Sequence, residues 1–263
     1  MAGLLPVSRS RPRHRHPSPL PLQSPAAHSD PTVKMAEKLY VTYNDVHKLC
    51  QESAEYILNN HQPQLMIAIG GGGYVPARIL RSFLKKPGMP NIPIQAIGLS
   101  LYEQLSTDNV VEEPGKKVTR TQWLDLTSLG EMKNLIGKKI LIVDEVDDTR
   151  TTLEYAVKEL EKDVEAARQK LGVEGKTEFS IFVLHASISQ EVNKAGQRLT
   201  TCKQNKDKPK KGTLPKDMMD EGRYMAARTV GDEWICYPWE ASDIEEHDEL
   251  ARQMKSRQAN GRA

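Results

Sequence analysis

Residues 139–152 read KILIVDEVDDTRTT, and this stretch decides the fold. Its run from Ile140 to Val143 is continuously apolar, which is typical of a strand buried on both faces in a parallel sheet. Four acids follow within five positions, and a helical pattern begins at Leu153. Open α/β sheets bind ligands at the carboxyl ends of their strands, and helix starts attract anions. Carboxylates beside an anion site favour a phosphorylated sugar, although a solvated acidic turn is a simpler alternative.

A second strand also runs into an anion-binding pattern. Residues 65–69 are a short apolar run, residues 70–73 are four consecutive glycines, and apolar residues at helical spacing follow as far as Phe83. Glycine adopts positive φ and lets bare backbone N–H groups approach a ligand closely. A glycine run alone also fits a flexible turn, but its place between a buried strand and a helix favours an anion site.

Strands and helices alternate along the rest of the chain. Apolar periodicity predicts a helix over about 45–60, capped by Asn44 or Asp45, and another over about 153–171. Short apolar runs predict three further strands at 92–99, 179–184 and 225–230. The sum is an α/β protein with a doubly wound parallel sheet.

The composition excludes several classes of protein. A length of 263 residues allows one ordinary domain with tails, and the net charge of +2 favours neither nucleic acid nor membrane as a partner. No apolar run approaches the length of a transmembrane helix. Three widely spaced cysteines, Cys50, Cys202 and Cys236, form neither a disulfide framework nor a metal site, so we expect a reducing, cytoplasmic location.

The two ends of the chain differ from its middle. Residues 1–34 are rich in proline and arginine and lack periodicity, so we expect a disordered tail. Their composition also hints at an organellar transit peptide, but the prolines disfavour the amphipathic helix that such peptides need. Met35 is an alternative start, and the predicted folded domain is 35–245. Residues 246–263 form a polar C-terminal tail with helical character.

The stretch 139–152 resembles the 5-phosphoribosyl-1-pyrophosphate (PRPP) motif of type I phosphoribosyltransferases, in which an apolar strand, two acids and a threonine-bearing turn follow one another. Within that family the chain is most similar to fungal hypoxanthine-guanine and xanthine phosphoribosyltransferases, from about Leu39 to Asp243. Arg150 stands where many relatives have glycine, and arginine is strained there if the backbone requires positive φ. Asp147 replaces a usually apolar residue, and its role is open.

The resemblance implies a role for each group of the motif. Asp144 and Glu145 would bind the ribose diol of PRPP and, together with Glu240, help to hold Mg²⁺. Asp148 would be the catalytic residue, because it falls where the family places an acid against purine N7. Further PRPP contacts would come from the 5′-phosphate loop and the pyrophosphate loop, which comprise Asp148, Thr149, Arg150, Thr151, Thr152, Gly71 and Gly72.

The purine would bind to a small hood formed by the last part of the domain. Trp234 and Trp239 lie within six residues, and aromatic faces stack well on planar bases. In the resembled family the first tryptophan stacks on the base, and the next backbone group, here Ile235, reads its exocyclic group. A family lysine points to the six-position oxygen, for which Lys208 is the better match and Lys206 the next. Core aromatics and a solvated basic loop are the alternative interpretations.

Two segments break the alternating pattern. Residues 101–123 are polar, and the resembled family has a mobile lid here, from which Lys117 or Arg120 would reach the pyrophosphate. Residues 186–205 separate the strand end at His185 from the lysine-rich run and show no convincing periodicity. We interpret them as a retained intron or a loop insertion. A spliced transcript that still encodes them would exclude the intron.

The leading interpretation is a Mg²⁺-dependent purine salvage enzyme, a homodimer as in the resembled family. It would convert hypoxanthine or guanine, with xanthine as a further candidate, and PRPP to the nucleotide and pyrophosphate. Adenine is disfavoured, because a lysine donor would meet its amino group instead of an oxygen. Two alternatives remain open: a non-catalytic PRPP-binding regulator, although the added nucleic-acid-binding region usual in such proteins is absent here, and an enzyme inactivated by residues 186–205.

Overall fold

The computed structural model divides the chain into two compact units, Met1–Met35 and Ala36–Ala263. All described residues lie in the second unit, at 38–102, 114–124, 135–187, 189–192, 198–203, 212–231 and 233–260. The predicted tail, 1–34, and both candidate lysines, Lys206 and Lys208, lie outside the described residues. The predicted domain limits therefore stay predictions.

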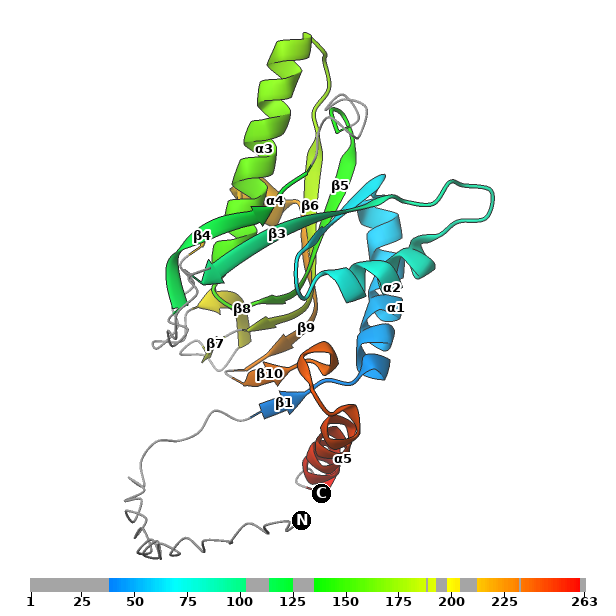
Figure 1. Cartoon of the computed structure of the whole chain (residues 1–263), viewed down its shortest axis with the longest axis vertical. Coiled ribbons are helices and arrows are strands. Elements are labelled where there is room, and N and C mark those ends of the chain that lie inside the picture. Colours follow the sequence, from blue (N-terminus) through cyan, green and yellow to red (C-terminus); the bar gives the residue numbers. More distant parts are fainter. Residues whose placement is uncertain are drawn as a thin grey trace, which may run out of the picture. The chain divides into compact units, whose positions relative to one another are not determined.

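A six-stranded sheet lies at the centre of the second unit, with its strands in the order β4-β3-β2-β5-β6-β9 (Figure 1). Neighbouring strands are parallel throughout, except that β4 pairs antiparallel with β3. The strands are β2 (Leu65–Ile69), β3 (Ile94–Tyr102), β4 (Pro114–Gln122), β5 (Lys139–Asp147), β6 (Glu178–Ser187) and β9 (Tyr224–Val230).

Helices cover both faces of this sheet, because its central strands are apolar on both sides (Figure 1). On one face, α1 (Tyr43–Asn60) and α2 (Tyr74–Leu84) share a buried cluster with Met66 of β2. On the other face, α3 (Thr151–Leu171) shares a second cluster with Ile67, the next residue of the same strand. This alternation confirms the predicted α/β protein with a doubly wound, mainly parallel sheet.

A separate two-stranded sheet joins distant parts of the chain. β1 (Lys38–Tyr40) pairs in parallel with β10 (Trp234–Cys236), and we call this pair the terminal sheet. The short 3-10 helix η2 (Pro238–Glu240) and then α5 (Ile244–Asn260) follow β10. α5 confirms the helical character predicted for the C-terminal tail, and it buries His247, whose Nε2 lies 2.9 Å from the carbonyl oxygen of Val41, next to β1.

Part of the predicted insert, 186–205, has regular structure. Its first two residues complete β6, and β7 (Ser189–Val192) then pairs antiparallel with β8 (Arg198–Lys203) as a two-stranded sheet of their own. Neither strand was predicted, since segments of four and six residues are too short to show a clear period. The short helix α4 (Lys216–Asp220) precedes β9. Within the described part of the chain, no helix has the length and apolar character needed to cross a membrane.

Three local predictions were wrong. The cap of α1 is Thr42 instead of Asn44 or Asp45. Oγ1 of Thr42 accepts a hydrogen bond from the backbone N of Asp45 at 3.2 Å, and the backbone N of Thr42 donates to the carboxylate of Asp45 at 3.0 Å. β5 continues to Asp147, so three of the four acids lie within the strand instead of after it. Residues 114–122 of the predicted irregular segment form β4.

Pairing with neighbouring strands explains both extensions. β6 supplies partners for β5 as far as the pair Asp147↔Ala186, so the ladder continues through the acids. β3 pairs with β4, and the register is irregular between Ser100 and Tyr102. A bulge accommodates one extra residue in one strand. The centre of the predicted lid, 103–113, lies outside the described residues.

Candidate active site

The carboxyl ends of β2 and β5 lie side by side in the middle of the sheet. From β2 the chain passes to its neighbour β3 on one side and then returns to β5 on the other, so the strand order reverses between β2 and β5. Open α/β sheets bind ligands at such a reversal, beyond the carboxyl ends of the strands. Both predicted anion loops start here, because glycines 70–73 follow β2 and residues 148–150 follow β5.

The glycine loop lies directly against β5. A Cβ atom at Gly72 would be 1.8 Å from the carboxylate of Glu145, and one at Gly73 would be 2.4 Å from the carbonyl oxygen of Val143. Only glycine fits at position 73, where the neighbour is backbone, whereas at position 72 a Cβ atom would displace the Glu145 side chain. Gly71 is exposed and has a φ of +90°, a conformation that other residues rarely adopt. The structure thus brings Gly71 and Gly72 together with the first acids of the motif.

Asp144 and Glu145 are neighbouring carboxylates at this edge of the sheet. Asp144 is only 6% exposed, and its Oδ1 accepts a hydrogen bond from the backbone N of Glu145 at 3.0 Å. Burial first, and then the charge of Glu145, raise the pKa of Asp144 well above its usual value. Oε2 of Glu145 is buried and has no hydrogen-bond partner among the described residues. A ligand that supplies hydrogen-bond donors or a cation would stabilise both groups.

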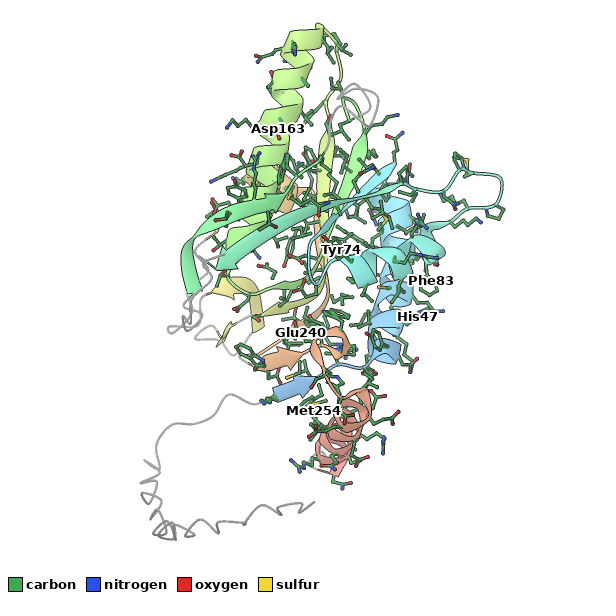
Figure 2. All side chains as sticks on the ribbon, viewed as in Figure 1. His47, Tyr74, Phe83, Asp163, Glu240 and Met254 are labelled. Atoms are coloured by element: carbon green, nitrogen blue, oxygen red, sulfur yellow. The ribbon has the colours of Figure 1, made fainter. Side chains whose placement is uncertain are left out.

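Glu240, the third predicted metal ligand, lies on η2 (Figure 2). Partial burial, and to a smaller extent the charge of Glu145, raise the pKa of Glu240. The described residues contain no group of three His, Cys, Asp or Glu side chains that could hold a metal by themselves. Mg²⁺ uses one or two carboxylates together with substrate oxygens and waters, so this set fits Mg²⁺ bound along with a phosphorylated substrate.

A buried hydrogen-bond chain supports Glu145 through its backbone. The Tyr237 hydroxyl donates to the carbonyl oxygen of Glu145 at 2.9 Å, and Nδ1 of His185 lies 2.9 Å from the same hydroxyl. Because that hydroxyl has a single proton, Nδ1 of His185 carries a proton and donates it. Burial raises the pKa of Tyr237, and burial with the charge of Arg228 lowers the pKa of His185 to about 4, so both side chains are neutral at pH 7.

The turn between β5 and α3 holds the predicted 5′-phosphate contacts. Asp148, Thr149, Thr151 and Thr152 are half-buried there, and Oγ1 of Thr149 donates to Oγ1 of Thr151 at 3.1 Å. Because α3 begins at Thr151, its first backbone N–H groups have no partner within the helix. Arg150 precedes the helix with φ of +65° and ψ of 0°, so the suspected positive φ is confirmed.

The terminal sheet carries the predicted purine contacts. Trp234 is 59% exposed in β10, and the neighbouring Ile235 is half-buried and pairs with Leu39 of β1. Trp239 instead stacks on Tyr237, with ring centroids 4.7 Å and planes 8° apart. The interpretation as a core aromatic therefore applies to Trp239, whereas Trp234 is mostly exposed.

The chain is similar in sequence to known phosphoribosyltransferases. It is 56% identical over 219 residues to xanthine phosphoribosyltransferase 1 of Saccharomyces cerevisiae, with 82% of this chain and 96% of that protein covered. It is 54% identical over 218 residues to the hypoxanthine-guanine phosphoribosyltransferase of Schizosaccharomyces pombe, with the same shares covered. The chain belongs to the purine phosphoribosyltransferases. No family model matches it.

One solved structure has a fold similar to that of this chain. A hypothetical protein from Neisseria gonorrhoeae, crystallised with bound ppGpp, is 36% identical to this phosphoribosyltransferase and superposes with a TM-score of 0.57. The match covers 83% of this chain and 98% of that one. Phosphoribosyltransferases are glycosyltransferases, so the predicted enzyme class is confirmed.

Sequence reasoning missed the residues that support the acids of this phosphoribosyltransferase. His185 was noted only as the end of a predicted strand, and Tyr237, which lies between Trp234 and Trp239, was not singled out. A polar residue at the end of a mainly apolar strand is a signal that was available for His185, since buried polar groups need partners. The tyrosine had no comparable signal, because its partner is a backbone carbonyl group distant in sequence.

Arg120, a predicted pyrophosphate contact, is held at α3 in this structure. Its guanidinium forms an ion pair with Glu159 and lies 4.1 Å from the ring centroid of Trp123. The same tryptophan donates from Nε1 to Asp163 of α3 at 2.8 Å (Figure 2). These contacts fix the end of β4 to α3. A contact with the pyrophosphate would require Arg120 to leave Glu159.

Proposed function

We propose that this phosphoribosyltransferase transfers the phosphoribosyl group of PRPP to hypoxanthine or guanine, with xanthine as a further candidate, and releases pyrophosphate. The observation that carries the proposal is the contact between Gly72 and Glu145 at the carboxyl ends of β2 and β5. A loop that suits pyrophosphate lies there against carboxylates that suit a ribose. Similarity to proteins named as xanthine and hypoxanthine-guanine phosphoribosyltransferases supports the choice of bases.

The acids at the end of β5 are assigned to the sugar. Asp144 and Glu145 would accept hydrogen bonds from the ribose hydroxyls, because ionised carboxylates only accept. Their negative charge would stabilise the positive charge that develops on the sugar as the glycosidic bond breaks. Burial disfavours the ionised form of Asp144, so a bound diol or cation is expected to lower its pKa again. Gly71 and Gly72 would offer backbone N–H groups to the leaving pyrophosphate.

The turn before α3 is assigned to the 5′-phosphate. The backbone N–H groups of residues 148–152, including that of Arg150, would bind the phosphate oxygens together with the hydroxyls of Thr149, Thr151 and Thr152. The start of a long helix favours a dianion through its unpaired N–H groups and its dipole. This assignment explains why three hydroxyls gather at one turn.

Mg²⁺ is the cofactor that fits the carboxylate oxygens of this site. Asp144, Glu145 and Glu240 would hold it jointly with oxygens of PRPP, since these three residues do not form a complete metal site alone. When bound, Mg²⁺ stabilises the charge on the departing pyrophosphate.

The base is assigned to the terminal sheet, Lys208 and Asp148. Trp234 would stack on the purine ring, and the backbone of Ile235 would read its exocyclic group. Lys208, outside the described residues, would donate to the six-position oxygen, which favours hypoxanthine and guanine over adenine. Asp148 would accept the proton of N7 or stabilise its movement during transfer.

Two further features are proposed on the family resemblance and the composition. We expect a homodimer, as in the resembled family, and a cytoplasmic location, as three scattered cysteines indicate. Size-exclusion chromatography with light scattering tests the first, and microscopy of a C-terminal fluorescent fusion tests the second.

An assay with four bases tests the proposed function. The purified chain is incubated with PRPP, Mg²⁺ and hypoxanthine, guanine, xanthine or adenine, and nucleotide formation is followed by chromatography. We expect turnover of the six-oxo purines and none of adenine. Asp148→Asn should reduce kcat about 100-fold or more, which is typical of a lost general acid or base. Asp220→Asn, at an exposed position at the end of α4, is the matched control and should leave turnover unchanged.

A folded chain that makes no nucleotide from any base would contradict the proposal. Deletion of residues 188–205 then distinguishes an inhibitory insert from a PRPP-binding regulator, because it removes β7 and β8 and leaves β6 complete. Recovery of turnover in the shortened chain would identify the insert as the cause.

A further inference from the structure

Asp147, a residue without an obvious task in the sequence, has a well-defined position at the end of β5. Its side chain is fully buried, and its Oδ2 accepts hydrogen bonds from Nε and Nη2 of Arg150 at 3.0 and 2.8 Å. The Tyr224 hydroxyl of β9 donates to the same oxygen at 2.6 Å. The guanidinium of Arg150 also lies 5.0 Å from the ring centroid of Tyr224. The three side chains therefore form one compact unit, which we call the clamp.

The clamp acts on the residue of the phosphate turn that has the least favourable backbone. Arg150 has a φ of +65°, a left-handed conformation that is costly for a residue with a side chain. Glycine would adopt it freely, but glycine would also leave the turn free to adopt other conformations. Here the guanidinium of Arg150 forms an ion pair with Asp147, three residues earlier in the chain. This ion pair closes the turn and compensates for the backbone strain.

A second contact holds the same turn from another side. The backbone N of Gly212 donates to the carbonyl oxygen of Thr149 at 3.2 Å. A Cβ atom at Gly212 would be 2.4 Å from the carbonyl oxygen of Arg150 and 2.9 Å from the backbone N of Thr151. Gly212 therefore packs directly on the backbone that the clamp shapes. The turn is fixed by side chains on one side and by a closely packed backbone on the other.

We propose that Asp147, Arg150 and Tyr224 are positioning residues that hold the 5′-phosphate turn in its binding conformation before PRPP arrives. The proposal rests on the proposed function, because it assigns this turn to the phosphate of PRPP. A preformed turn binds its ligand more tightly, since no ordering cost is left for the binding step. In this chain Arg150 stands where other relatives have glycine, and the buried carboxylate of Asp147 compensates for the strain in the backbone of Arg150.

The buried charges make the clamp testable as a unit. Removing one member of a buried ion pair leaves the other without its main compensation, whereas removing both together avoids that penalty. Asp147→Val restores the apolar residue usual at this position, and Arg150→Gly restores the usual glycine. The two substitutions should therefore each be harmful alone and compensate each other when combined.

The test compares steady-state constants for PRPP with a saturating six-oxo purine. Each single variant should raise the KM for PRPP about tenfold or more with a much smaller change in kcat, and the double variant should recover most of that loss. Tyr224→Phe removes one hydrogen bond only and should raise the KM about threefold. Ile57→Ala, on the buried side of α1, is the control for general destabilisation and should lower the melting temperature without changing the KM.

Two results would overturn the clamp. One is a set of single variants that have a lower melting temperature but keep the wild-type KM for PRPP, as Ile57→Ala should. The other is a double variant whose KM is the product of the two single effects. Failure of the proposed function is distinguishable, because it is seen in the wild-type chain as absent turnover. Calorimetric titration of PRPP into the same variants then reports on the clamp without turnover.

Discussion

The two halves of the candidate site are built differently. The phosphoribosyl half lies where β2 and β5 end in the middle of the sheet, and its acids are buried or half-buried beside the hydrophobic core. The purine half lies on the terminal sheet, a two-stranded pair formed by segments far apart in sequence, and its main residue, Trp234, is 59% exposed. The proposed reaction centre is thus part of the folded core, whereas the proposed base-binding residues lie on a separate small sheet.

The difference indicates how each half responds to change. Residues of the phosphoribosyl half are fixed by close contacts such as that of Gly72 with Glu145, so small changes there should alter the chemistry strongly. Residues of the purine half have fewer packing constraints, so substitutions should change affinity for the base with little effect on stability.

The largest effect is expected at the glycine loop. A Cβ atom at Gly72 meets the end of the Glu145 side chain, which is able to move away, so Gly72→Ala should fold but displace that carboxylate. We expect kcat/KM to fall about 100-fold or more, because a shift of about 1 Å in a catalytic group has this consequence. Gly73→Ala is the contrasting variant, since its Cβ meets the backbone of Val143 and should destabilise the fold itself. Equal melting temperatures for the two variants would contradict this distinction.

The next effect concerns the buried support of Glu145 and its dependence on pH. Burial and Arg228 lower the pKa of His185 to about 4, against a weaker opposing effect of Asp45. Between about pH 6.5 and pH 4 the unfolded chain binds a proton that the folded chain does not, so stability decreases as the pH decreases. The loss is about 1.4 kcal/mol per pH unit, and about 2 kcal/mol between pH 7 and pH 5.

His185→Asn isolates this contribution. The asparagine amide keeps a donor for the Tyr237 hydroxyl but does not titrate. Denaturant unfolding at pH 7 and pH 5 should show that the variant loses about 2 kcal/mol less than the wild type over this interval. Identical losses in both proteins would show that His185 is protonated in the folded state at pH 5.

Trp234 should matter for the base and not for the fold. Trp234→Ala is expected to raise the KM for guanine about 10- to 100-fold, as base stacking contributes about 1–3 kcal/mol, and to leave the melting temperature nearly unchanged. Trp239→Ala is the matched variant, because Trp239 stacks on Tyr237. It should cost about 1–2 kcal/mol of stability. If both variants lower stability equally, Trp234 is a structural residue as well.

The smallest effect is expected where α5 meets the start of α1. Nζ of Lys255 lies 2.7 Å from the Asp45 carboxylate, at an exposed position. Exposed ion pairs contribute about 0.2–1 kcal/mol, so Lys255→Ala should lower the free energy of unfolding by about that amount and leave the KM for PRPP unchanged. A larger loss in denaturant unfolding would mean that α5 contributes more to the core than this contact indicates.

The sequence predicted the core of the fold because buried parallel strands leave continuous apolar runs. β2 was predicted with its observed bounds, and the ends of α3 were close. The extension of β5 through its acids was missed, because it depends on pairing with β6, which is distant in sequence. β4 and the hairpin of β7 and β8 were missed for a related reason, since their own patterns are polar or short.

The candidate site was predictable only in part. The motif itself indicated Asp144, Glu145 and the threonine turn, because their spacing is specific to an anion site after a strand. The partnership of Asp147 with Tyr224 was not predictable, since 77 positions separate the two residues. The hydrogen bond between the Tyr237 hydroxyl and the carbonyl oxygen of Glu145 was not predictable for the same reason. Residues that position a site through long-range contacts leave no local pattern in one sequence.

The contrast between the two halves is tested most directly by binding PRPP without a purine. Isothermal titration calorimetry with PRPP and Mg²⁺ would compare the wild type with Trp234→Ala and Glu145→Gln. If the phosphoribosyl half is preformed in the core, the wild type and Trp234→Ala bind one PRPP per chain with equal affinity, and Glu145→Gln binds at least tenfold more weakly. PRPP binding that requires a purine, or that is lost in Trp234→Ala, would contradict the account.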